Sequence, residues 1–137
     1  GPKREELQSK IDNLGLSSRI TLRGNVLDVH ERIKDAGLFV LPSNFEGTSN
    51  ALLEAMIMGL PCISTNCAGS DEVIENGKSG IIVPVGDTES LTKAMRTMLT
   101  NRNDAVAMAN RAHERVAKNY SVESVSQMWM RVARGEC

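Results

Sequence analysis

Residues 38–56, LFVLPSNFEGTSNALLEAM, join a continuous apolar run to a helical pattern through a polar loop. Pro42 closes the run Leu38–Leu41, as expected of a strand that is buried on both faces. We expect a helix to start at about Ser49 and to stop at Gly59. A buried strand followed directly by a helix is the unit from which parallel sheets are built.

The same alternation runs through the rest of the chain. Short apolar segments predict further strands at 19–22, 62–65 and 80–83. Helical spacing predicts helices at 7–14, 29–36, 72–75, 87–99, 104–118 and 121–134. The helix after Asp87 carries one apolar stripe, formed by Leu91, Ala94, Met95, Met98 and Leu99. The pattern therefore predicts an α/β fold, a Rossmann-like parallel sheet with flanking helices, whose ligands bind beyond the carboxyl ends of the strands.

Composition narrows the classes of function. The chain has 137 residues and a formal net charge of −1, which suits one domain and gives no field that would attract nucleic acid. No apolar run is long enough to span a membrane. The spacing of the three cysteines matches no zinc site. An odd number of cysteines is more simply explained if the protein is in the reducing cytoplasm, where disulfides are rare. Cys62 is predicted to be a small core residue and Cys67 to be more exposed.

Two carboxylates flank the start of the helix that follows residue 48. Glu46 lies in the predicted loop and Glu54 lies about one and a half turns into the helix. The N–H groups of residues 47–50 lie at or near the helix start, where donors lack intrahelical acceptors and an anion is favoured. Carboxylates accept hydrogen bonds from pairs of hydroxyl groups. Taken alone, a helical glutamate such as Glu54 is more often a solvated charge. Together, an anion site at the helix start and carboxylates for hydroxyl groups on either side fit a phosphate flanked by two hydroxyl-rich rings, which describes a nucleotide sugar.

The segment FEGTSNALLEAM (residues 45–56) resembles the E-x7-E segment of retaining glycosyltransferases of family 4, which have the GT-B fold. The likeness continues through GLPCIST (59–65), AGSDEVI (68–74) and NGKSGIIVP (76–84). Upstream, SRITLRGNV (18–26) is similar to the strand that leads to the family's nucleobase pocket. The resemblance covers nearly the whole chain.

The resemblance implies a role for each matched residue. Glu46 would contact the donor sugar near the transferring carbon and act as the catalytic residue, while backbone donors at Gly47, Thr48 and Ser49 would bind sugar hydroxyls. The N–H groups of Asn50 and Ala51 would bind the distal phosphate, and Glu54 would hold both ribose hydroxyl groups. Arg23 and Gly24 would border the base. Thr48-Ser49 stands where a bulky residue and glycine often follow the Glu-Gly pair, so the donor sugar stays open.

The resemblance also implies what this stretch of sequence lacks. Residues 1–137 correspond to the nucleotide-sugar-binding C-terminal domain, shortened at its amino-terminal side and ending in the helices at about 104–134. The family's Arg and Lys from an earlier loop, and its acceptor-binding N-terminal domain, have no counterpart here. A diphosphate leaving group carries roughly two negative charges, whereas a helix N-terminus supplies about half a positive one. We therefore expect this stretch alone to be inactive in transfer.

The resulting hypothesis is a hexosyltransferase of bacterial surface polysaccharide synthesis. It would use a UDP- or GDP-sugar donor, a glycan or lipid-linked acceptor, and no cofactor or metal, because no Asp-x-Asp pair of the metal-dependent transferases is present. Peripheral association with the inner face of the membrane would involve the missing part. Two alternatives stay open: a nucleotide-binding α/β domain without transfer chemistry, and a sugar-nucleotide epimerase that shares the GT-B fold.

Overall fold

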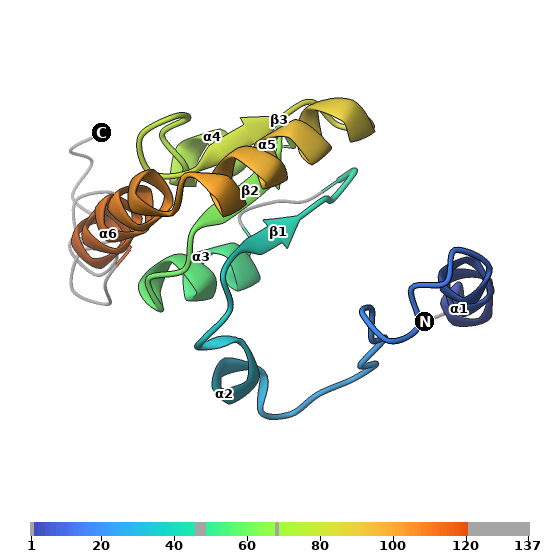
Figure 1. Cartoon of the computed structure of the whole chain (residues 1–137). Coiled ribbons are helices and arrows are strands. Elements are labelled where there is room, and N and C mark those ends of the chain that lie inside the picture. Colours follow the sequence, from blue (N-terminus) through green and yellow to red (C-terminus); the bar gives the residue numbers. More distant parts are fainter. Residues whose placement is uncertain (1, 46–48, 68, 121–137) are drawn as a thin grey trace. The chain divides into compact units, whose positions relative to one another are not determined.

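The computed structural model describes residues 2–45, 49–67 and 69–120 (Figure 1). The chain forms two compact units, Gly1–Ile33 and Lys34–Cys137. The first unit contains α1 (Arg4–Asn13) and α2 (Val29–Ile33). The elements of the second unit are, in order, β1 (Phe39–Leu41), α3 (Asn50–Ile57), β2 (Cys62–Thr65), α4 (Ser70–Val73), β3 (Ile81–Val83), α5 (Thr88–Thr100) and α6 (Arg102–Asn119).

The first unit corrects one prediction. Residues 19–22, predicted to be a strand, form none, and the carbonyl of Leu22 accepts a hydrogen bond from the Arg4 guanidinium at 2.9 Å. A strand forms only where a neighbouring strand completes its ladder, and the described residues of this unit contain no such neighbour. The helix predicted at 7–14 is present as α1, in which Ile11 is buried whereas Leu7 is exposed.

The second unit confirms the α/β class. Its described residues form one parallel sheet in the order β1-β2-β3, so three of the four predicted strands are present. Phe39 lies opposite Cys62, and Ile63 lies opposite Ile81. Since all three strands run the same way, the loops that follow them leave the sheet at one edge. The short helix predicted at 72–75 is instead α4 at Ser70–Val73.

Helix α5 covers one face of the sheet. Ala94 and Met98 pack with Ile63 and Val83 in a common core, as the predicted apolar stripe requires. Leu99 departs from that prediction because 51% of it is exposed. The predicted cap is confirmed: Asp87 accepts a hydrogen bond from the backbone N–H of Ser90 at 2.9 Å.

Helix α6 packs against α3 and α5. It extends the helix predicted at 104–118 by a few residues, and its buried stripe consists mainly of alanine: Ala105, Ala109, Ala112 and Val116. Small side chains allow a helix to approach its neighbours closely. The helix predicted at 121–134 lies outside the described residues. No helix within the described ranges has both the length and the apolar character needed to cross a membrane.

Gly80 stands where a side chain has no room. A Cβ built there would lie 2.9 Å from the backbone oxygen of Cys62 and 3.2 Å from a methyl group of Ile74. We expect Gly80→Ala to lower the free energy of unfolding by about 1–3 kcal/mol, because backbone must move to relieve the overlap. Urea denaturation would measure the loss. Gly37→Ala is the control, since its nearest neighbour is 3.6 Å away, and equal losses in the two variants would contradict the expectation.

Candidate functional site

The loop after β1 ends at a well-formed helix start. Ser49 has an extended backbone, with φ −80° and ψ 115°, and its Oγ accepts a hydrogen bond from the N–H of Leu52 at 3.4 Å. The Ser49 carbonyl accepts the first bond of the helix, from the N–H of Leu53 at 3.1 Å. Ser49 is therefore the N-cap, which confirms the predicted start of this helix.

The first turn of α3 has main-chain donors that the helix itself does not satisfy. Asn50 and Ala51 are the first two residues of the helix, so its geometry provides no intrahelical acceptor for their N–H groups. Both residues are exposed. The helix dipole places about half a positive charge at this end. This turn can therefore bind an anion through its backbone.

Glu54 lies on the same side of α3. It follows Asn50 by four residues and Ala51 by three, the spacings that bring helical side chains together, and it is exposed. The opposite side of the helix is buried through Leu52 and Met56. Burial of that side leaves Asn50, Ala51 and Glu54 together on the exposed side of the helix. Within the described residues, an anion-binding turn and a hydroxyl-accepting carboxylate are thus adjacent.

Three of the predicted site residues, Glu46, Gly47 and Thr48, lie outside the described residues. The loop before them is described as far as Phe45, whose side chain is 93% exposed.

The path of this loop depends on Thr65, a residue that the sequence analysis did not single out. Thr65 ends β2 and is buried, and its hydroxyl group donates to the carbonyl of Ser43 at 2.5 Å, with the carbonyl of Leu41 3.4 Å away. A buried hydroxyl group needs an acceptor, and here the acceptors belong to the neighbouring strand and its loop. A threonine at the end of a buried strand is the signal that could have indicated this tether.

A buried group of hydroxyl and thiol side chains lies at the end of β2 and the start of α4. Ser64 and Ser70 are joined by a hydrogen bond of 3.0 Å, and the Cys67 sulfur lies 3.5 Å from the Ser70 hydroxyl group. Cys67 is 7% exposed against 1% for Cys62, so it is the more exposed of the two as predicted, but both are buried. Its burial follows from these contacts, which the apolar pattern alone does not reveal. Cys62 is a core residue as predicted, and burial raises the pKa of its thiol to about 12.

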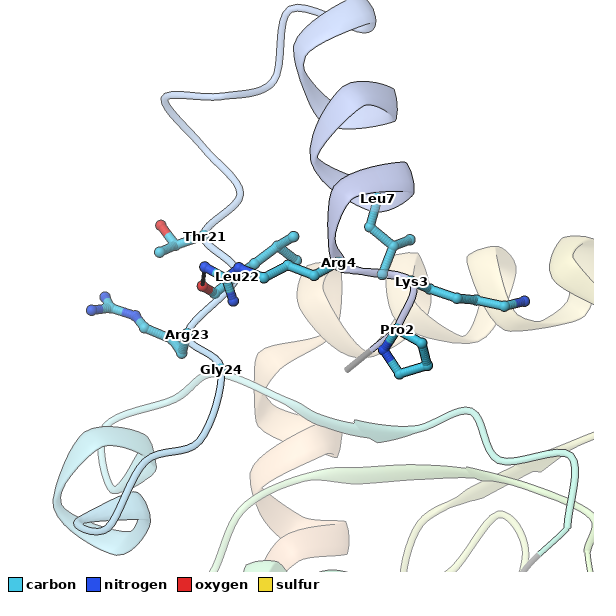
Figure 2. Close-up of a pocket in the computed structure, with 8 residues that line it drawn as sticks. All are labelled: Pro2, Lys3, Arg4, Leu7, Thr21, Leu22, Arg23 and Gly24. Carbon is cyan, nitrogen blue, oxygen red and sulfur yellow. Dashed lines mark hydrogen bonds between the residues drawn. The ribbon is translucent and has the colours of Figure 1, made fainter.

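Arg23 and Gly24 lie in the first unit, where they line a pocket of about 600 Å³ (Figure 2). Figure 2 shows Arg4 reaching from the start of α1 to the segment that carries Leu22. Gly24 has φ +70°, and a Cβ there would meet the Arg4 guanidinium at 3.3 Å. The full lining consists of Pro2, Lys3, Arg4, Leu7, Thr21, Leu22, Arg23 and Gly24. The lining combines apolar side chains with the cationic side chains of Lys3, Arg4 and Arg23.

Metal binding and thiol chemistry each place requirements on the side chains of the described residues. No three His, Cys, Asp or Glu side chains among them are grouped so that they could hold a metal ion. Both cysteines among them are buried, so neither is presented as a nucleophile. The arrangement at α3 combines main-chain N–H groups that have no intrahelical acceptor with a carboxylate on the same side of the helix.

The tether at Thr65 can be tested by removing one hydroxyl group. We expect Thr65→Val to lower the free energy of unfolding by about 1 kcal/mol, because the loop loses its buried donor, and we expect Thr65→Ser to retain most of it. Urea denaturation followed by circular dichroism would measure both. Thr92→Val is the matched control, since that hydroxyl group is exposed and bonds within its own helix. A loss in Thr92→Val as large as that in Thr65→Val would contradict the tether.

Residues 1–101 match the family model described as glycosyl transferases group 1. Among curated proteins, the chain is 26% identical to the lipopolysaccharide core biosynthesis glycosyltransferase LpsE of Rhizobium meliloti, over 96% of this chain and 39% of LpsE. It is 31% identical to the putative colanic acid biosynthesis glycosyltransferase WcaL of Salmonella typhimurium, over 93% of this chain and 34% of WcaL. The chain therefore spans between a third and two fifths of the length of these relatives.

Among solved structures, the fold matches that of the Anabaena protein HepE in complex with UDP. The TM-score is 0.89 at 22% sequence identity, and the match covers 96% of this chain and 36% of HepE. HepE has also been crystallised with UDP-glucose. At this level of identity the likeness describes the fold.

Proposed function

Because the chain belongs to the group 1 glycosyl transferases, we propose that it is the part of such an enzyme that binds the nucleotide-sugar donor. The observation that carries this proposal is the first turn of α3. There Asn50 and Ala51, whose N–H groups have no intrahelical acceptor, are exposed and lie on the same side of the helix as Glu54. Phosphate oxygens accept from amides and ribose hydroxyl groups donate to a carboxylate, so one nucleotide can satisfy both groups.

Each site residue has a proposed role. Asn50 and Ala51 bind the distal phosphate, and Glu54 holds the two ribose hydroxyl groups. The sugar is bound by Glu46, near the transferring carbon, and by the backbone of Gly47, Thr48 and Ser49. Arg23 and Gly24 border the base, a role that fits the pocket they line in the first unit. These roles are those of a family 4 enzyme that retains the configuration of the transferred sugar.

The donor is proposed to be a UDP- or GDP-hexose. The complexes of HepE with UDP and UDP-glucose support a uridine nucleotide. The α3 terminus supplies about half a positive charge against roughly two negative charges on the leaving diphosphate. Further cations are therefore needed for transfer, and we propose that another part of the whole protein supplies them. The residues of this chain alone would bind the donor without transferring the sugar.

The whole protein is proposed to act in the synthesis of a bacterial surface polysaccharide. The names of LpsE and WcaL, which refer to lipopolysaccharide core and colanic acid, support this direction. In this proposal a separate N-terminal domain binds a glycan or lipid-linked acceptor, at the inner face of the membrane in the cytoplasm.

The role of Glu54 can be tested with UDP and with UDP that lacks both ribose hydroxyl groups. We expect the unmodified protein to bind UDP more tightly than the dideoxy analogue by about tenfold or more, because two hydrogen bonds to a charged acceptor are lost. In Glu54→Ala the two ligands should bind equally. Isothermal titration calorimetry on the protein that contains this chain would measure all four affinities.

Glu89→Ala is the control for this experiment. Glu89 is an exposed acid in the first turn of α5, so its removal changes the net charge equally without touching α3. We expect this variant to retain the preference for UDP. If Glu54→Ala kept the same preference for UDP over the dideoxy analogue as the unmodified protein, the assignment of Glu54 to the ribose would be overturned. Failure of the unmodified protein to bind either UDP or GDP would overturn the proposed donor site.

A further inference from the structure

The carboxyl end of α3 has one carbonyl group that the chain's local fold does not satisfy. Gly59 adopts φ +74° just beyond the helix, and the N–H groups of Gly59 and Leu60 bond back to the carbonyls of Met56 and Ala55, each at 3.0 Å. This is the Schellman arrangement, and it leaves the Ile57 carbonyl, on the last residue of α3, without a donor from within the turn.

His113 of α6 supplies that donor. Its Nδ1 lies 2.6 Å from the Ile57 oxygen, although 56 residues separate the two in sequence. A carbonyl group only accepts, so Nδ1 carries the hydrogen in this contact. The imidazole therefore caps α3 from a different helix.

The contact is possible because α6 approaches α3 closely. The two helices pack against each other (Figure 1). On α6, Ala109 and Ala112 are buried, and His113 stands at the margin of this stripe, directly after Ala112 and one turn beyond Ala109. Larger side chains in the stripe would hold the imidazole away from Ile57.

Helix α6 binds other carbonyl groups in the same way. Arg115 donates to the carbonyls of Val73 and Glu72 at the carboxyl end of α4, at 2.9 Å each. Arg102 donates to the carbonyl of Gly37, ahead of β1, at 2.7 Å. Of these residues, His113 is the one whose bond ends on α3.

We infer that His113 is a positioning residue for the ligand-binding turn of α3. This inference rests on the proposed function and adds a residue that does not touch the ligand. Helix α3 has eight residues and is about 12 Å long, so it moves as one rigid rod. Burial of Leu52 and Met56 holds the packed face of this helix, and the bond from His113 adds a restraint at its far end, so that the direction of the first turn is fixed at both ends. Small misplacements of binding groups weaken recognition strongly.

Three variants separate positioning from general stability. His113→Leu removes the donor, and His113→Asn places an amide N–H close to the position of Nδ1. Arg102→Met removes a bond of the same kind from the same helix, but one that ends away from α3. The readouts are amide hydrogen exchange in α3, the Kd for UDP and the midpoint of urea denaturation, all measured on the protein that contains this chain.

We expect His113→Leu to speed amide exchange in α3 by about fivefold, the change that loss of one ordinary hydrogen bond produces, and to weaken UDP binding by a similar factor. His113→Asn should restore both values toward those of the unmodified protein. Arg102→Met should lower the denaturation midpoint while leaving α3 exchange and UDP affinity unchanged.

The inference is overturned if His113→Leu exchanges and binds like the unmodified protein, or if Arg102→Met reproduces both effects of His113→Leu. Failure of the unmodified protein to bind UDP and GDP would instead overturn the proposed function. In that case the exchange rates in α3 alone decide whether His113 holds this helix in place.

Discussion

The parallel pairing of β1 with β2 is the constraint on which the candidate site depends. It brings the loop after β1 beside the end of β2, where the buried hydroxyl group of Thr65 donates to the Ser43 carbonyl. The loop is thereby held at a defined position before it enters α3. Without this pairing, Thr65 would not reach Ser43, and the segment that leads into α3 would lose this hydrogen bond to the sheet.

The two ends of α3 are held by different means. Ser49 caps the amino end within the same segment of chain, whereas His113 caps the carboxyl end from α6. The face between them that carries Leu52 and Met56 is buried. The result is a short helix whose exposed side carries Asn50, Ala51 and Glu54, the residues proposed to bind the ligand. A binding group of this kind gains affinity because little conformational freedom is lost when the ligand arrives.

Local sequence signals predicted the elements of this site well. The start of α3 at Ser49 and the cap at Asp87 follow from short side chains that can accept hydrogen bonds from nearby N–H groups. The end of α3 follows from Gly59, which adopts a positive φ. The burial of Cys62 follows from its place in an apolar strand. Each of these features depends on residues a few positions apart.

The sequence by itself thus determined the α/β class, the place of α3 and the residues on its exposed side. Only the tertiary structure decided that residues 19–22 form no strand, that Cys67 is buried, and that Thr65 and His113 hold the segments around α3. The physical reason is the same in each case. Pairing, burial and capping of these residues depend on partners from other elements, and whether such partners come within reach is determined by how the elements pack.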